Sequence, residues 1–156
     1  ESERAREHAM GVHDLSLELS EHQLHARSRV ILGRYYARTK DSELSLLHYN
    51  AALETFSEEA NPTNAVETEM LLGQVLVDVG RTSEASEHYL DALSIAEAND
   101  FRLLQAEILA RLGTIRGDRS ERVAYLQRSL SVFKDLGAHT RMKEIQNSVH
   151  RALMGW

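Results

Sequence analysis

Apolar residues recur along this chain at steps of three and four positions. In the central stretch Ala85, Tyr89, Ala92 and Ala96 follow this spacing, which places their side chains along one stripe of an α-helix. The pattern occurs in eight segments separated by breaks, and it predicts an all-α fold class. The predicted helices cover residues 3–18, 21–38, 42–58, 63–79, 82–98, 101–115, 119–136 and 139–154.

Start and stop signals accompany these helices. Three starts carry a residue whose side chain can accept hydrogen bonds from the first free backbone N–H groups of a helix. They are Ser20 with Gln23, Asp118 with Glu121, and Asn61 with Pro62. Three stops carry a residue that tolerates the left-handed backbone conformation after a helix, namely Gly80, Asn99 and Gly137.

The chain repeats itself with a period of 40 residues. The pair Leu-Gly occurs at Leu32-Gly33, Leu72-Gly73 and Leu112-Gly113, and the group His48, Tyr49, Ala52 and Leu53 returns as His88, Tyr89, Ala92 and Leu93. A fixed period of this length is typical of solenoids, in which stacked units share one core. Glycine inside a helix costs about 1 kcal/mol relative to alanine, so we expect close helix contacts at these glycines, with Gly73 packed near Tyr89.

A deletion shortens the third unit. The register continues only if three residues are missing between Gly113 and Gly117. Arg122 then stands where the second unit has Ala85. The loss amounts to almost one helical turn.

These units predict one repeat domain over residues 1–156. Residues 1–19 form the second helix of a truncated repeat, 20–59 and 60–99 are complete repeats, 100–137 is the shortened repeat and 138–156 is a terminal helix. Because the chain opens in mid-repeat and without an initiator Met, we expect it to be a fragment of a larger protein.

The repeated residues resemble the tetratricopeptide repeat, a helix–turn–helix unit. The second unit fits best, through Leu72-Gly73, Gly80, Ala85, Tyr89, Ala92 and Leu93. The resemblance implies a right-handed α-solenoid of antiparallel helix pairs that binds proteins or peptides in a concave groove. The usual proline at the end of each unit is missing, and the period of 40 exceeds the common value of about 34. Units of 40 residues are similar to those of bacterial signal-transduction and transcription regulators and of some eukaryotic scaffold proteins.

In this family the first helix of each pair lines the groove, and the register transfers that role to residues of this chain. The predicted groove residues are Arg27, Val30, Arg34 and Arg38 in the first unit, Glu67, Met70, Gln74, Val77 and Asp78 in the second, Glu107, Ala110 and Thr114 in the third, and Glu144, Asn147 and Arg151 in the last helix. One end of this set is basic, so we expect a partner segment that is acidic near Arg27, Arg34 and Arg38. The alternative is that these residues are ordinary solvated helix faces. Val30 and Arg34 stand where some family members have the Asn and Lys of a chaperone-tail clamp, so binding of a chaperone tail is not predicted.

Composition and charge limit the classes of partner that we expect. The chain has 18 Lys and Arg against 24 Asp and Glu, a net charge of −6, and an acidic chain repels phosphate backbones. No apolar run approaches the roughly 18 residues of a membrane-spanning helix. We therefore expect a soluble, cytoplasmic domain that binds neither nucleic acid nor membrane. The absence of cysteine excludes disulfides and cysteine-based metal sites.

Candidate chemistry is sparse. His22 and His25 have a spacing that could ligate a metal on one helix face, but no third ligand is evident. His8, His48 and His88 occupy one repeat position, and helix packing would separate them by roughly 10 Å, too far to share an ion. Glycine-rich phosphate loops and nucleophile elbows are absent. We predict no metal, no cofactor and no enzymatic activity.

Three functions are consistent with these sequence features. The leading one is a non-catalytic scaffold module that binds a protein or peptide segment. The second is a regulatory or sensor domain of a bacterial transcription regulator or signalling enzyme, acting through contacts within a larger chain; the full-length gene would reveal its neighbours. The third is homo-oligomerisation by end-to-end stacking, because the first helix lacks its partner and Trp156 ends an apolar terminus.

Overall fold

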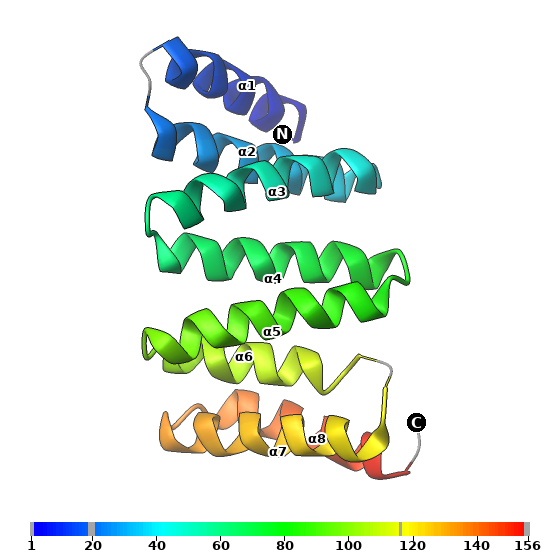
Figure 1. The fold of residues 1–156 in the computed structure, drawn as a ribbon. Helices are drawn as coiled ribbons and strands as arrows, with labels where there is room; N and C mark the ends of the chain where they lie inside the picture. The colour runs from blue at the N-terminus through cyan, green and yellow to red at the C-terminus, as the bar shows by residue number, and fades with distance from the viewer. Residues whose placement is uncertain (1, 19–20, 116, 155–156) are drawn as a thin grey trace.

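The computed structural model describes residues 2–18, 21–115 and 117–154, and within these ranges it contains eight α-helices and no strand. Figure 1 shows them running back and forth and stacking in chain order, with α1 at one end of the molecule and α7 and α8 at the other. Each helix packs against the next one along the chain. The helices are α1 (Ser2–Glu18), α2 (His22–Arg38), α3 (Ser42–Glu58), α4 (Pro62–Asp78), α5 (Thr82–Ala98), α6 (Arg102–Leu112), α7 (Arg119–Asp135) and α8 (His139–Met154).

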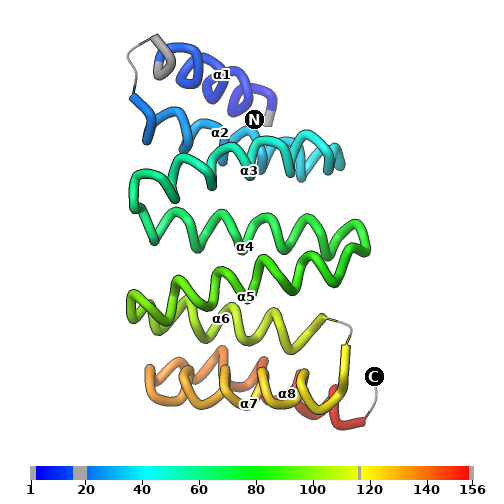
Figure 2. The backbone as a smooth tube through the Cα atoms, viewed as in Figure 1, coloured from blue at the N-terminus to red at the C-terminus, as the bar shows by residue number. Residues whose placement is uncertain are grey.

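This arrangement is the all-α solenoid that the repeat predicts. Helices α2 to α5 each have 17 residues, and three-residue turns join them, so a 40-residue unit consists of two similar halves. The backbone trace in Figure 2 shows this alternation of long helices and tight turns. No helix of the described ranges has the length and apolar character needed to cross a membrane.

The turns between the long helices share one backbone geometry. The second of the three turn residues has a positive φ, as at Ala60 (51°), Gly80 (83°) and Asp100 (53°). The next residue donates its backbone N–H to a carbonyl five positions back, for example from Arg81 to Leu76 at 2.8 Å, which is the Schellman cap of a helix end. The predicted stops at Gly80 and Gly137 are confirmed. Helix α5 also stops at Asn99, its C-cap residue, but the left-handed backbone falls on Asp100.

Two of the predicted helix starts are confirmed. The Asn61 side chain accepts from the N–H of Asn64, and Pro62 occupies the first turn of α4. The Asp118 carboxylate accepts from the N–H groups of Ser120 and Glu121 at the start of α7. The third predicted cap, Ser20, lies outside the described residues.

The helical glycines sit at close contacts between paired helices. A Cβ added to Gly73 would lie 2.7 Å from Cε1 of Tyr89, and one added to Gly33 would lie 2.5 Å from Cε1 of Tyr49. Both tyrosines are 1% exposed. The predicted packing of Gly73 near Tyr89 is therefore confirmed.

Helix α6 is shorter than expected. It ends at Leu112 rather than at residue 115, so it has 11 residues where α2 and α4 have 17. Residues 113–115 form a turn and bend instead. The physical reason is the three-residue deletion, because the chain must leave the helix early to reach the start of α7 at Arg119.

Candidate binding surface

The first helices of successive pairs, α2, α4, α6 and α8, are joined by side-chain hydrogen bonds. Asn61 at the start of α4 donates to Gln23 of α2 at 2.9 Å. In the same way, Arg111 of α6 donates to Gln74 of α4 at 2.7 Å. The Nε of Arg141 in α8 donates to Glu107 of α6 at 2.8 Å. These four helices are neighbours, so the residues predicted to line a groove lie on elements that touch one another.

Most of the predicted groove residues are accessible. Val30, Met70, Gln74, Val77 and Glu107 are half-buried, whereas Arg27, Arg34, Arg38, Glu67, Asp78, Thr114, Glu144, Asn147 and Arg151 are exposed. Ala110 departs from the expectation. It is 6% exposed and belongs to an apolar cluster with Ile145 and Ala152 of α8, because the packing of α8 covers its short side chain. The Ala110 side chain therefore offers a partner almost no surface.

Five residues of α2 form a mixed basic and apolar row, which we call the α2 stripe. They are Leu24, Arg27, Ile31, Arg34 and Arg38, and their steps of three and four place them on one helix face. Leu24 is 38% exposed and Ile31 is 46% exposed. Sequence reasoning found the arginines and missed these two apolar members, although the same spacing connects them.

The exposure of Ile31 follows from its place in the repeat. The same position in the third unit is Arg111, which reaches back to α4, and in the second unit it is Leu71, which packs against the cluster of Tyr49 and Leu72. This position therefore faces the preceding unit, whose first helix carries Gln74 in one case and contributes Val30 and Ala37 to the cluster in the other. Before α2, the described part of the chain supplies no such helix, and Ile31 is left uncovered.

The charges of the α2 stripe differ from those farther along the surface. No carboxylate of a described residue lies within 4.0 Å of the guanidinium groups of Arg27, Arg34 or Arg38. By contrast, Arg141 bridges Glu107 and Glu144, and Glu107, the larger influence, raises the pKa of Arg141. Among the described residues, the three arginines of the α2 stripe therefore make no ion pair, whereas acidic residues near α8 are partly neutralised.

The two histidines with metal-ligand spacing turn to different partners. His22 faces Glu59 at 3.4 Å, whereas Nε2 of His25 lies 3.3 Å from Nε2 of His13 and accepts from Arg29. No group of three or more potential ligands occurs among the described residues. Burial is the largest influence that lowers the pKa of His13 and of His25, so both rings are held toward the neutral form.

The histidines at the shared repeat position also have different surroundings. His48 stacks on Tyr36 with ring centroids 5.4 Å apart, and burial, followed by the charge of Arg29, lowers its pKa. His88 lies 2.7 Å from Glu69, whose hydrogen bond raises the pKa of His88. His8 is exposed. The histidine at this repeat position therefore has a different environment in each of the three places where it occurs.

Comparison with known proteins supports the repeat assignment. Residues 70–99 match the family model of the tetratricopeptide repeat, and this match lies within the best-fitting unit, residues 60–99. No curated protein sequence matches the chain.

Two solved structures share the fold. The apo form of RapI aligns with a TM-score of 0.76 at 19% identity, over 81% of this chain and 47% of that chain. BtubC (BKLC) from P. vanneervenii aligns with a TM-score of 0.83 at 20% identity, over 99% of this chain and 66% of that chain. This chain spans about half the length of RapI, and at these identities the likeness shows the fold of a tetratricopeptide-like helical solenoid.

Proposed function

We propose that this chain is a non-catalytic scaffold that binds a protein or peptide segment along α2, α4, α6 and α8. The segment is acidic, with apolar residues between its acids, where it meets the α2 stripe. The observation that carries this proposal is the set of three exposed arginines that have no carboxylate partner among the described residues, together with exposed Leu24 and Ile31 on the same helix face.

Charge is the first support for an acidic partner. The chain has six more acidic than basic residues, yet no described acidic side chain neutralises Arg27, Arg34 or Arg38. Guanidinium groups bind carboxylates through two parallel hydrogen bonds, which makes arginine well suited to this recognition. An acidic segment would pair these groups and would be attracted over a distance of about one Debye length, some 8 Å at physiological salt.

Apolar contact is the second support. Ile31 lies between the arginines, and Leu24 lies one step before Arg27 on the same face, so a segment along the stripe would cover both. Burial of apolar surface contributes about 25 cal/mol per Å², which adds affinity that salt does not screen. The repeat match and the shared solenoid fold support the general class of interaction scaffold, and they carry no information about the partner.

A matched pair of charge variants tests the proposal. The probe is a synthetic peptide with glutamates and leucines alternating at steps of three and four, and its affinity is measured by fluorescence anisotropy. Arg27→Glu/Arg34→Glu changes the stripe, whereas Arg4→Glu/Arg119→Glu makes the same charge change at exposed arginines of α1 and α7. We expect at least about tenfold weaker binding by the stripe variant at roughly 50 mM salt and a smaller difference at roughly 300 mM.

Three results would overturn the proposal. The first is equal affinity of the parent and the folded stripe variant at low salt, and the second is no binding by the parent. The third is a concentration-dependent dimer, seen by light scattering and dissolved by Leu24→Glu, which would assign the stripe to contact between copies of the chain.

A further inference from the structure

A cavity of about 350 Å³ opens where α6 ends against α7 and α8. Its described lining residues include two arginines, two hydroxyl residues and no carboxylate, namely Gly113, Thr114, Arg122, Ser148 and Arg151. Arg122 also lines an adjacent cavity together with Glu121, which does not line the first cavity. The cavity is therefore basic within an acidic chain.

Arg122 is out of pattern for its place in the repeat. The same position holds Ser45 in the first unit and Ala85 in the second, and both are fully buried. Ser45 donates its hydroxyl to the carbonyl of Gly33 at 2.9 Å. The Nε of Arg122 donates to the carbonyl of Gly113, the matching glycine, at 3.3 Å. The third unit thus keeps the hydrogen bond of the first and makes it with a side chain that extends much farther.

The short α6 makes room for this arginine. Helices α2 and α4 continue for six residues beyond the point where α6 stops, and in those units the position opposite holds a small side chain. In the third unit the absence of the last helical turns leaves the cavity, and Arg122 fills one wall of it. The deletion and the change from a small residue to arginine are therefore two parts of one structural difference.

Arg151 supplies the second guanidinium from α8. Its Nη2 donates to the hydroxyl of Ser148 at 3.2 Å, and that hydroxyl donates to the backbone carbonyl of Glu144. The Thr114 hydroxyl donates to the carbonyl of Arg111 at 2.8 Å. Both hydroxyl protons are thus engaged, and the donors left for a ligand belong to the two guanidinium groups.

No described residue competes for these donors. No hydrogen bond to a described residue is made by Nη1 and Nη2 of Arg122 or by Nε and Nη1 of Arg151. No described carboxylate lies within 4.0 Å of either guanidinium group. A bond to Gly113 or Ser148 orients each planar fork, so little side-chain entropy remains to be lost on binding. Two guanidinium groups that line one cavity match an oxyanion in charge, and guanidinium N–H groups are strong hydrogen-bond donors to carboxylates and phosphates.

We propose that Arg122 and Arg151 form an oxyanion-binding site. The ligand group is a carboxylate or a phosphate, carried either by an acidic residue of a bound polypeptide or by a free small anion. The site stands on its own geometry and goes beyond the proposed function, since it needs no contact with the α2 stripe. Thr114 and Arg151 belong to the predicted groove residues, so a bound segment could present its acid to this site.

NMR of the arginine Nε–H groups in the full chain tests the site. Sodium phosphate and sodium acetate are titrated separately, with sodium chloride keeping the ionic strength constant. We expect saturable shifts of the Arg122 and Arg151 signals in the parent. The affinity should fall about tenfold or more in Arg122→Gln and in Arg151→Gln, the loss expected when charge-assisted hydrogen bonds are removed. Saturation by acetate assigns the site to carboxylates, and saturation by phosphate alone assigns it to phosphate-type anions.

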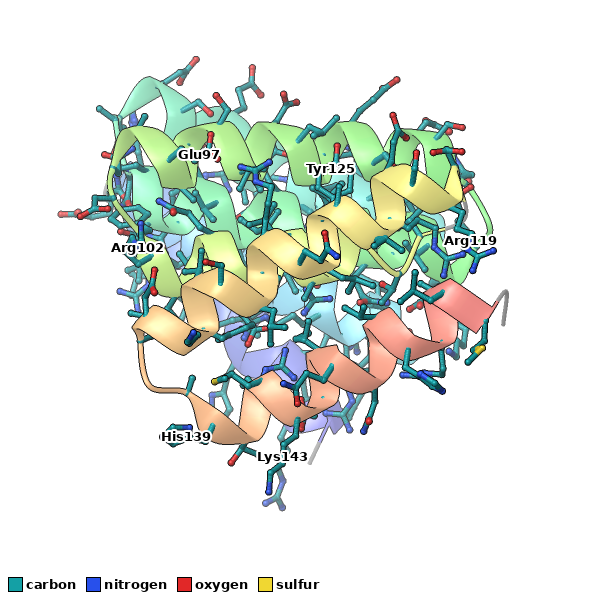
Figure 3. All side chains as sticks on the ribbon, turned by 90° about the horizontal axis from the view of Figure 1, so that it is seen from below. Glu97, Arg102, Arg119, Tyr125, His139 and Lys143 are labelled. Carbon is teal, nitrogen blue, oxygen red and sulfur yellow. The ribbon has the colours of Figure 1, made fainter. Side chains whose placement is uncertain are left out.

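The controls remove equal charge from the same helices. Figure 3 shows Arg119 at the beginning of α7 and Lys143 near the beginning of α8. Arg119→Gln and Lys143→Gln should leave the affinity within about twofold, because exposed charges outside the cavity act only through screened attraction. If Arg122→Gln does not fold, Arg122→Lys keeps the charge but not the planar fork, and weaker binding is still expected.

Unsaturable drift in the parent, or equal losses in cavity and control variants, would overturn the oxyanion site. This outcome is distinct from failure of the proposed function, because the titration uses no peptide. The Arg27→Glu/Arg34→Glu variant should bind phosphate or acetate like the parent.

Discussion

The imidazole Nδ1 of His88 lies 2.7 Å from Oε2 of Glu69, and this ion pair joins α5 to α4. Forty residues earlier the same two positions hold His48 and Arg29, a pair that repels when the histidine is protonated. Glu69 raises the pKa of His88, whereas burial and then Arg29 lower the pKa of His48. A single change at the partner position thus reverses the direction of the shift.

The His88–Glu69 pair predicts a loss of stability toward alkaline pH. Because its folded-state pKa is raised above the usual 6.5, the stabilisation is fully present below pH 6.5 and is lost as the pH rises through the raised pKa. In Glu69→Gln the pKa of His88, measured by NMR, should fall. The free energy of unfolding should drop by about 1 to 2 kcal/mol at pH 5, between the values for neutral and charge-assisted hydrogen bonds. A parent–variant difference that stays constant up to pH 9 would contradict this.

His13 and His25, which lie between α1 and α2, predict the opposite dependence of stability on pH. Burial lowers the pKa of His13 and of His25, so the stability from their packing is present above pH 6.5 and is lost as the pH falls through the lowered values. Hydrogen-exchange protection at Ala9, buried in α1, should fall below pH 6. Equal protection factors at pH 5 and pH 7 would count against this account.

Substitution of Gly73 tests the close contact with Tyr89. Gly73→Leu should lower the free energy of unfolding by about 1–3 kcal/mol, because overpacking outweighs the better helix propensity of leucine. Gly11 is the control, since a Cβ there meets nothing within 4 Å. Gly11→Ala should raise stability by up to about 1 kcal/mol. Denaturant unfolding gives both values, and a Gly73→Leu protein as stable as the parent would show that the contact is not tight.

The backbone conformation of Ala60 predicts that its substitution by glycine stabilises the protein. Its φ of 51° is left-handed, and this conformation costs a non-glycine residue roughly 1 kcal/mol. Ala60→Gly should therefore raise the free energy of unfolding by about that amount. The same change at Ala98, exposed in the last turn of α5, should lower it by up to about 1 kcal/mol. Changes of equal sign at the two sites would refute the assignment of strain to Ala60.

Much of this fold is predictable from local patterns. Seven of the eight helices begin and end within one residue of the predicted bounds, because helical hydrogen bonds and apolar stripes connect residues only three to five positions apart. The glycine contacts were also predictable, since Gly33 and Gly73 recur with Tyr49 and Tyr89 at one spacing. The remaining helix, α6, deviates from its predicted end. Its last turns were removed by a deletion, and where the helix ends depends on the path of the chain to α7.

The candidate sites are less predictable, because they depend on contacts between helices. The basic half of the α2 stripe could be recognised in the sequence, but the exposure of Leu24 and Ile31 depends on which helices cover α2. Ala110 has the right register for the surface and is buried by α8. Arg122 was recognisable as an exception to the repeat, whereas its cavity with Arg151 was not.

The sequence by itself determined the helices, their 40-residue order and the glycine–aromatic contacts within each unit, because these follow from short-range periodicity that is copied from unit to unit. The pairing of His88 with Glu69 and the cavity shared by Arg122 and Arg151 are visible in the folded structure and could not be predicted from the sequence pattern. The physical reason is that these side chains come from different helices, and their distances are set by where each helix ends and how it packs on its neighbours.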